Sequence, residues 1–356
     1  MRVPFPRRRS IRLAGLAAIL LAAAALVWWR GPSWDLVRGA FVSVYWRWVV
    51  LAIALNLLSV LARSLAWRTV INQAMPPPHP RYSLIFSAFS VGLLANAVLP
   101  GRIGELARVA VLTRRLRGRR GVWATLVGTV FAHRVFDVVA VSLIIVYVLV
   151  TARIPAWAIT SLAAIVAVGL ALVAFGVASA RLHHRPVLDE LGAVRRLVTM
   201  ARQGLGVMRA PLAAAGAIAF QCVGWLCQLF AVYATMRAFN IEEPLAAAGL
   251  VLVLMNVATI FPLWPGNVGL LQAAVALPLV SYGIDYAHGF AFGIGLQAVE
   301  ASVGVGVGLA FLAREGLSFA MLRHMPDATQ AEVPPEEDAE PTPVERRARA
   351  RARVPG

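Results

Sequence analysis

Long apolar runs, separated by short basic segments, dominate the sequence. Six of these runs are long enough to cross the hydrocarbon core of a bilayer as an α-helix, which takes about 20 residues. They are predicted at residues 13–29, 49–67, 122–150, 156–178, 211–236 and 286–313. The pattern therefore predicts an all-α integral membrane protein.

Two further apolar runs, residues 82–112 and 245–283, are each interrupted by a proline-glycine pair, Pro100-Gly101 and Pro265-Gly266. Proline removes a helical hydrogen bond and glycine loosens the backbone, so each pair breaks its helix. If residues 82–112 crossed the membrane once, the arginine-rich segment 114–120 would lie outside, against the positive-inside rule. We therefore predict two re-entrant hairpins; a plain bundle of eight spans is the alternative.

The two breaks share a short motif. Pro100-Gly-Arg-Ile-Gly104 is echoed by Pro265-Gly-Asn-Val-Gly269, and an asparagine precedes each break, Asn96 and Asn256. Broken segments in corresponding positions of two halves are typical of transporters built from inverted repeats. We predict one repeat at about 49–150 and a second repeat, inserted with opposite polarity, at about 211–313.

Composition supports a membrane location and narrows the chemistry. The 356 residues are 60% apolar and 14% charged, with a mean hydropathy of +0.73, which is too apolar for a soluble domain. All 34 basic residues are arginine, so no lysine is present for Schiff-base catalysis. The net charge is +17, and the arginines that carry it cluster between the apolar runs. This placement favours anionic lipid surfaces as partners and does not indicate nucleic acid. Two cysteines five residues apart form neither a disulfide framework nor a metal site.

The chain divides into three parts. Residues 1–12 are a basic leader, residues 13–315 a polytopic membrane domain, and residues 316–356 a proline-rich tail with an acidic and then a basic block, typical of disorder. Tryptophans and an arginine, with no small-residue cleavage site, follow the first run, so it is predicted to stay as a span. Both termini are then cytoplasmic, in a multi-pass protein of the cell membrane.

The arginines also predict on which side of the membrane the loops lie. Arg63, Arg68 and Arg81 are predicted to mark a cytoplasmic loop after the second span. Segment 181–209 is basic with one apolar face, which indicates either a helix lying on anionic lipid or a helix packed on a neighbouring loop. Small residues in the last span predict close helix packing, namely Gly293, Gly295, Ala298, Ala301, Gly304, Gly306 and Gly308.

Three acidic residues, Glu105, Asp137 and Glu300, are predicted inside the bilayer. A charge there costs roughly 2.5–3.5 kcal/mol, so it is normally paired or lines an aqueous cavity. Arg134 lies about 18 Å into its span, and Asp137 shares its helical face, so the two can neutralise one another. Glu300 lies at a matching depth, where it could meet Arg134 or Arg102. The alternative interpretation is that these are ion pairs that fix helix register.

The helix that restarts after the first break, from Ile103 onward, points its positive N-terminus at the break, which favours an anion such as phosphate. Arg102, Arg134 and Arg108 are therefore the predicted ligands of a lipid phosphate. No Walker-type lysine motif exists, so we predict transport that is equilibrative or coupled to protons through Asp137 or Glu300. His133 faces away from Arg134 and is interpreted as a packing residue.

The run Asn96-x-x-Leu-Pro-Gly-Arg-x-Gly-Glu-x-x-Arg108, the Arg134-x-x-Asp137 pair and Pro265-Gly-x-x-Gly269 resemble the lysylphosphatidylglycerol synthase transmembrane-region family, whose members are described as flippase-like. The resemblance covers about residues 12–315 and implies a lipid-translocating module. In bifunctional members this module is joined to a soluble aminoacyltransferase domain. The resemblance of this chain is to the membrane module and does not include that domain. Family substrates range from aminoacylated phospholipids to polyprenyl-phosphate-linked sugars. The family often has glutamate where this chain has His133.

The predicted function is therefore a lipid translocase that moves an anionic phospholipid or a polyprenyl-phosphate-linked lipid between leaflets. No catalytic residue, cofactor or metal is expected, and the protein is not expected to be an enzyme. The alternative is a non-transporting scaffold that docks a cell-envelope glycosyltransferase or lipid-modifying enzyme. An intramembrane enzyme would need a nucleophile or metal cluster near the break, and the sequence offers none.

Overall fold

The computed structural model describes residues 33–99, 103–116, 122–154, 210–259 and 267–314, with isolated helical positions at Ile159, Ala167 and Ala171. Within these ranges every extended regular element is an α-helix, and no strand occurs. The predicted all-α class is confirmed. The leader, the predicted spans 13–29 and 156–178 apart from those isolated positions, the amphipathic segment 181–209 and the tail lie outside the described residues.

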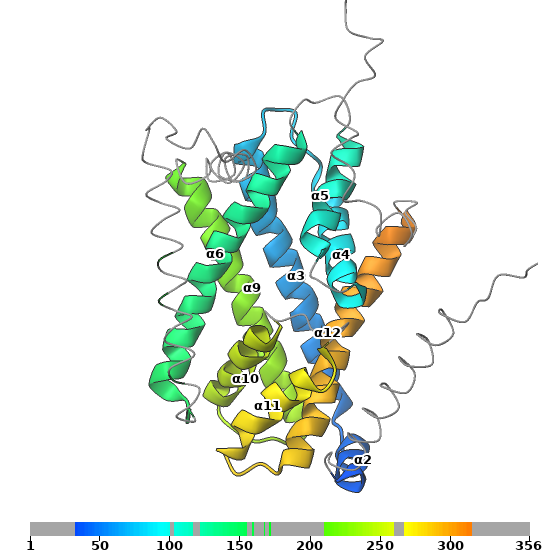
Figure 1. The fold of residues 1–356 in the computed structure, drawn as a ribbon, viewed down its shortest axis with the longest axis vertical. Helices are drawn as coiled ribbons and strands as arrows, with labels where there is room; N and C mark the ends of the chain where they lie inside the picture. The colour runs from blue at the N-terminus through cyan, green and yellow to red at the C-terminus, as the bar shows by residue number, and fades with distance from the viewer. Residues whose placement is uncertain are drawn as a thin grey trace, which may run out of the picture.

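Four helices are long and apolar enough to cross a membrane: α3 (Trp46–Ala74), α6 (Val122–Thr151), α9 (Pro211–Ala238) and α12 (Tyr286–Arg314). Their 28 to 30 residues give lengths of about 42–45 Å at 1.5 Å per residue, more than the roughly 30 Å of hydrocarbon. These four correspond to four of the six predicted spans. They run side by side through the length of the molecule (Figure 1).

The two broken segments form pairs of short helices, each too short to cross alone. The first pair is α4 (Tyr82–Val98) and α5 (Gly104–Arg115), and the second is α10 (Leu245–Ala258) and α11 (Leu270–Val280). In Figure 1 the first pair lies against the upper half of the long helices and the second pair against the lower half. A further short helix, α2 (Trp34–Val42), lies at the lower end, between the predicted spans 13–29 and 49–67.

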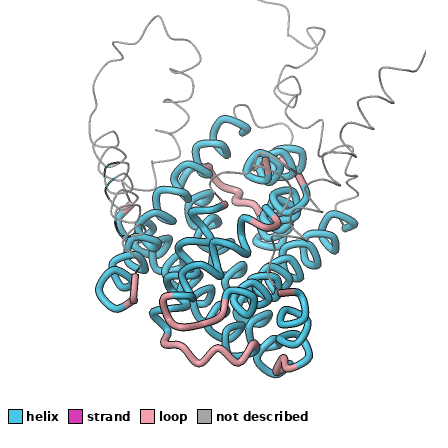
Figure 2. Tube along the Cα trace, turned by 60° about the horizontal axis from the view of Figure 1, so that its bottom comes forward, coloured by secondary structure: helices cyan, strands magenta, loops and turns pink. Residues whose placement is uncertain are grey.

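Helix packing follows the small residues. α3 and α9 pack along much of their length at the centre of the bundle (Figure 1), where a Cβ added to Gly224 would stand 3.4 Å from the carbonyl oxygen of Ser59. Figure 2 shows the helices and their connecting loops from a second direction. On α12, a Cβ at Gly293 would stand 3.1 Å from the Cα of Gln272, and one at Gly308 would stand 2.9 Å from the carbonyl oxygen of Ser90. The predicted close approach is therefore real at these glycines, since lipid supplies no hydrophobic drive and helices associate by tight packing.

The prediction does not hold along the whole of α12. A Cβ at Gly304 or Gly306 would meet nothing within 4 Å, so these two glycines lie where no described helix packs. Gly295 differs again, because its missing side chain makes room for the ring of Phe239. The glycines of α12 thus have different surroundings, and only some of them lie at a contact between helices.

Buried side chains gather in two principal apolar clusters. One joins the upper part of α3 to α4, α5 and the start of α6, and the other joins α9, α10 and α11 to the lower parts of α6 and α12. Large apolar side chains are also exposed on the outside of the long helices, including Leu143, Val150 and Leu212, the last at 89%. Monomeric soluble proteins rarely expose such surfaces in contiguous patches, so the outside of this bundle fits lipid.

The structure corrects one prediction about the second span. The sequence predicted that it ends near Trp67 and that Arg63 begins a cytoplasmic loop, but α3 continues without a break to Ala74. Arg63 therefore belongs to the interior of the helix, 17 residues after its first residue. The physical reason is that buried apolar residues continue on α3 beyond it, at Ala66, Trp67, Val70 and Ile71, so the arginine does not end the helix.

Candidate functional site

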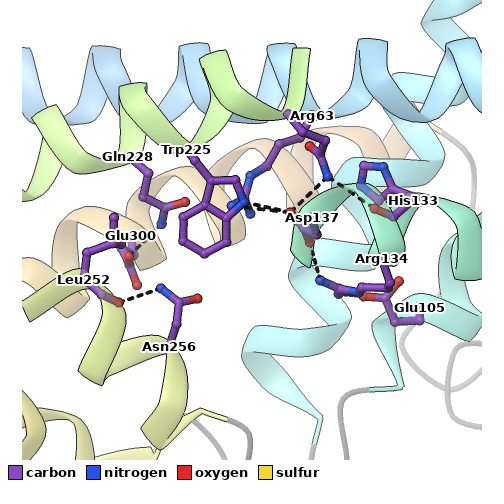
Figure 3. A network of polar contacts seen from close by, with 11 residues as sticks. Arg63, Glu105, His133, Arg134, Asp137, Trp225, Gln228, Leu252, Asn256 and Glu300 are labelled. Carbon is purple, nitrogen blue, oxygen red and sulfur yellow. Dashed lines mark hydrogen bonds and ion pairs between the residues drawn. The ribbon is translucent and has the colours of Figure 1, made fainter. Parts of the chain in front are cut away.

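Five side chains form a chain of alternating charge near mid-depth. In order they are Arg108 and Glu105 from α5, Arg134 and Asp137 from α6, and Arg63 from α3. Arg134 Nη1 donates to Asp137 Oδ2 at 2.8 Å, and Arg134 also pairs with Glu105 (Figure 3). Glu105 in turn pairs with Arg108. Three guanidinium groups and two carboxylates leave one positive charge in this chain.

Asp137 is the most heavily bonded member. It stands 15 residues after Val122, halfway along α6, and it is 7% exposed. Its Oδ1 accepts from Gln221 Nε2 at 2.9 Å and from Trp225 Nε1 at 2.8 Å, both on α9 (Figure 3). The predicted Arg134–Asp137 pair is confirmed, and the α9 donors are an addition that the sequence did not indicate. A carboxylate with this many donors and two cations is held in its ionised form.

Arg63 reaches the same carboxylate from α3. Its Nη2 lies 4.0 Å from Asp137 Oδ1, and its guanidinium carbon lies 4.5 Å from the centre of the Trp225 ring. The stem of the side chain passes over Gly224, where an added Cβ would stand 2.8 Å from Arg63 Cγ. Among the residues that the structure describes, Nε and Nη2 of this guanidinium have no hydrogen-bond partner. Arg63 is thus a cation held by stacking and by a loose ion pair.

Arg108 and Arg134 differ sharply in exposure. The Arg108 side chain is 5% exposed and stacks on Trp67, with the guanidinium carbon 4.7 Å from the ring centre. The Arg134 side chain is 50% exposed although it is anchored by two carboxylates. Of the two, Arg134 can therefore contact a ligand directly, while Arg108 holds Glu105 in place.

The first break is stabilised by Asn96, whose Oδ1 accepts from the backbone N–H of Gly104 at 2.8 Å. α5 begins at Gly104, one residue beyond the predicted restart at Ile103, and Glu105 occupies its first turn. Gly104 also packs against the backbone of Gly92, so a side chain there has no room. Pro100, Gly101 and Arg102 lie outside the described residues, and the predicted role of Arg102 stays a prediction.

The second break has a different polar lining. Asn256 Nδ2 donates to Leu252 O within α10 at 2.8 Å, and Gly269 caps α11 with φ of +91° (Figure 3 shows the asparagine). Gln272 Nε2 donates to Gln297 Oε1 at 2.5 Å, which ties α11 to α12. Pro265 and Gly266 lie outside the described residues.

Glu300 lies halfway along α12 and accepts from Gln228 Nε2 of α9 at 3.0 Å (Figure 3). The sequence predicted a contact with Arg134 or Arg102. Arg134 instead lies with Glu105 and Asp137, because these carboxylates are on its own helix and on the adjacent α5. Among the described residues, the hydrogen-bond partner of Glu300 is therefore a neutral amide. A contact with Arg102 stays a prediction, because Arg102 lies outside the described residues.

His133 is buried at 3% and meets the ring of Phe89 edge-on, with ring centres 6.1 Å apart. It faces away from the exposed Arg134, as predicted for a packing residue. Within the described ranges no cluster of three or more histidine, cysteine or acidic side chains could hold a metal ion. Cys222 and Cys227 are both free thiols.

Long apolar helices with lipid-facing surfaces, two broken helix pairs and ion pairs at mid-depth together define a multi-pass α-helical membrane protein. Residues 14–308 match the lysylphosphatidylglycerol synthase TM region, and the chain belongs to this family. The resemblance seen in the motifs is thereby confirmed.

A curated relative extends this finding. The chain is 25% identical over 293 residues to a UPF0104 membrane protein of Methanothermobacter thermautotrophicus, which covers 75% of this chain and 83% of the relative. No solved structure matches the chain.

Proposed function

We propose that this protein is a flippase-like lipid translocase, which moves an anionic phospholipid or a polyprenyl-phosphate-linked lipid between the leaflets of the cell membrane. The observation that carries the proposal is Arg134. It lies about 18 Å into α6 by helical rise, and half of its side chain surface is exposed. A guanidinium exposed at this depth is costly in lipid alone, so it needs an anion or water beside it.

A phosphate group fits this position for two reasons. The alternating chain carries one net positive charge, and arginine presents paired donors that match phosphate oxygens. Arg134 is held from behind by Glu105 and Asp137, so its orientation is fixed before a ligand arrives. The acyl or prenyl chains remain in the bilayer while the headgroup passes the site. No covalent step is part of this proposal.

We propose six full spans and two re-entrant hairpins arranged as an inverted repeat, and the packing of the described helices supports the repeat. Let α3, α4, α5 and α6 be exchanged with α9, α10, α11 and α12, respectively. Each packed pair among these eight helices then becomes another packed pair: α4 with α12 becomes α10 with α6, and α5 with α6 becomes α11 with α12. The central α3–α9 pair maps onto itself. Such repeats allow alternating access by rocking one half against the other around a central site.

Orientation follows from the same proposal, with both termini cytoplasmic and the connections on either side of the first hairpin facing the cytoplasm. Single cysteines introduced at His79 and Arg115, in a background free of Cys222 and Cys227, would react with an impermeant label from the same side. Labelling from opposite sides would support the eight-span bundle instead. Transport is equilibrative or coupled to protons through Asp137 or Glu300.

The direct test is leaflet exchange of fluorescent anionic phospholipids and of a polyprenyl phosphate in proteoliposomes. Wild type is expected to exchange at least one of them, and Arg134→Ala is expected to lose that exchange. Arg68→Ala is the matched control, because it removes the same charge from an exposed position near the end of α3. Loss in both variants, or in neither, would refute the site. Absence of exchange by a folded wild-type protein would favour the scaffold for a cell-envelope glycosyltransferase.

A further inference from the structure

The crossing of α3 and α9 reveals a correspondence between the two halves that the breaks alone do not show. The two proline-glycine breaks are 165 residues apart, since 265 − 100 = 165. The two small residues that meet at the crossing, Ser59 and Gly224, are also 165 apart. The same spacing therefore relates the breaks and the centre of the bundle.

Polar residues keep this spacing on both sides of the crossing. Three residues before the crossing residue, α3 has Asn56 and α9 has Gln221. Four residues after it, α3 has Arg63 and α9 has Gln228. On a helix these offsets share the face of the crossing residue. Each half thus points one amide and one further polar side chain into the centre.

The amides reach across to the opposite half. Gln221 of α9 donates to Asp137 Oδ1 and to the backbone of His133 on α6. Asn56 of α3 donates to the backbone oxygen of Val299 on α12, the residue before Glu300, at 3.5 Å. Both amides therefore bind the opposite long helix close to its acidic residue.

The residues four positions after the crossing reach the acidic residue of their own half. Arg63 faces Asp137, and Gln228 donates to Glu300. Asp137 and Glu300 thus occupy similar places near the midpoints of α6 and α12, although the 165-residue spacing itself pairs Asp137 with Ser302, two residues after Glu300. The chemistry differs at one equivalent position, where a guanidinium in the first half is replaced by a neutral amide in the second.

The surroundings of Glu300 contain few charges. Among the elements packed against α12, α4 and α11 carry no charged side chain, and the charges of α2 and α9 lie near one end of the bundle. The remaining neighbour, α3, contributes Arg63, which attracts Glu300 electrostatically from its position beside Asp137. Within the described ranges no cation forms an ion pair with Glu300. The charged groups of α2 and α9 are Asp35, Arg38 and Arg237. α3 also carries Arg47 at its start and Arg68 one turn beyond Arg63.

We propose that Glu300 is a proton-binding site that couples translocation to the proton gradient, while Asp137 remains ionised as the anchor of the arginines. This inference rests on the proposed lipid translocation and assigns its energy source. Glu300 is partly buried, and its one hydrogen-bond partner among the described residues is an amide. Such a carboxyl group is accommodated most readily when neutral, because withdrawing an uncompensated charge from water is costly. Binding converts the carboxylate and one proton into the neutral acid, and the proton leaves to water on the other side.

Arg63 links this proton to the lipid site. It is loosely held at 4.0 Å from Asp137, and two of its nitrogens lack hydrogen-bond partners. When Glu300 loses its proton, the new carboxylate attracts Arg63 away from Asp137. Asp137 then bonds Arg134 more strongly, and the guanidinium that holds the phosphate loses attraction for it. Protonation of Glu300 reverses these changes.

The first measurement is difference infrared spectroscopy of the full-length protein in lipid membranes during a pH titration. We expect a carbonyl band of a neutral carboxylic acid that disappears as the pH rises. Glu300→Gln should remove this band, and Asp137→Asn should retain it. Gln228→Arg should also remove it, because that variant supplies Glu300 with the cation that Asp137 has in Arg63. No band in wild type, or a band lost in Asp137→Asn and kept in Glu300→Gln, would overturn the proposal.

The second measurement separates this inference from the proposed function. Lipid exchange in proteoliposomes should be stimulated by an imposed proton gradient in wild type and should show no stimulation in Glu300→Gln. Exchange without any gradient effect, together with no titrating band, would leave a translocase that is not proton-coupled. A titrating Glu300 band without exchange of any lipid would leave the proton site and remove the translocase. Stimulation by a Na⁺ gradient alone would assign Glu300 to a different ion.

Discussion

The two broken helix pairs share a backbone design but differ in chemistry. α5 carries Glu105 and Arg108 beside the exposed Arg134, whereas α10 and α11 contain no charged residue. The long helices repeat the contrast, because Asp137 is bound by two arginines and Glu300 by an amide. In the proposed inverted repeat, both halves would keep the same packing while the first half binds the anion and the second half changes charge.

Removing each central carboxyl group should give the largest difference between the halves. Asp137→Ala leaves two guanidinium groups and two α9 donors without their shared acceptor, and breaking such a buried pair costs about 3–5 kcal/mol. Glu300→Ala loses one amide partner, a loss of about 1 kcal/mol. The free energy of unfolding in mixed detergent micelles measures both. Equal losses would show that the halves are not energetically distinct.

Alanine substitutions of the glycines at the starts of α5 and α11, Gly104 and Gly269, should destabilise the protein for different reasons. In Gly104→Ala the new methyl group overlaps the backbone of Gly92, and overpacking costs about 1–3 kcal/mol. In Gly269→Ala the site is open, and the cost is the positive φ, about 1–2 kcal/mol. Thermal unfolding should rank Gly104→Ala as the more damaging change. Gly304→Ala, with nothing within 4 Å, is the control and should not destabilise the protein, because alanine favours a helix interior by about 0.5–1 kcal/mol over glycine.

Two tryptophans provide a matched pair of indole donors. Trp225 donates to the Asp137 carboxylate at 2.8 Å, while Trp67 donates to the hydroxyl of Thr129 at 3.1 Å. Phenylalanine keeps much of each aromatic surface and removes the donor. Trp225→Phe should cost about 1.5–3 kcal/mol and Trp67→Phe about 0.5–1.5 kcal/mol, because hydrogen bonds to charged groups are stronger. The reverse order in the same unfolding assay would mean that Asp137 is neutral.

The asparagines before the breaks should show the smallest contrast. Asn96 satisfies the N–H of Gly104 across the break, so Asn96→Ala should cost about 1 kcal/mol. Asn256 donates to the carbonyl oxygen of Leu252 in its own helix, which also accepts the helical backbone hydrogen bond. Asn256→Ala should therefore change the free energy of unfolding by only about a few tenths of a kcal/mol. Hydrogen exchange at the start of α5 would detect the first effect locally. Unchanged exchange there in Asn96→Ala would argue against the cap.

Sequence reasoning was successful where the cause is local. Apolar run length predicted the four long helices, and proline and glycine predicted where the short ones are broken. The three-residue spacing of Arg134 and Asp137 predicted their pairing, because neighbours on one helical face meet whatever surrounds them. The family also followed from the motifs. The assignments of the lipid phosphate to Arg102, Arg134 and Arg108 remain predictions.

Sequence reasoning failed where the cause is the contact of distant helices. Arg63 was assigned to a loop, and neither Gln221 nor Trp225 was recognised, although all three meet at Asp137. One available signal was the apolar pattern that continues past Arg63 to Ile71. Another was the 165-residue spacing, which pairs Arg63 with Gln228.

The amino-acid sequence by itself determined the membrane class, the long helices, the two breaks and the local ion pair, because hydropathy, backbone chemistry and helical periodicity act over a few residues. Only the tertiary structure decided that Asp137 receives a second cation, Arg63, while Glu300 receives an amide. That depends on how α3 and α9 cross at Ser59 and Gly224, since the crossing sets which side chains, more than a hundred residues apart in the chain, point to one centre. Charge pairing in a low-dielectric interior is decided by distances of a few ångströms, and no local pattern encodes them.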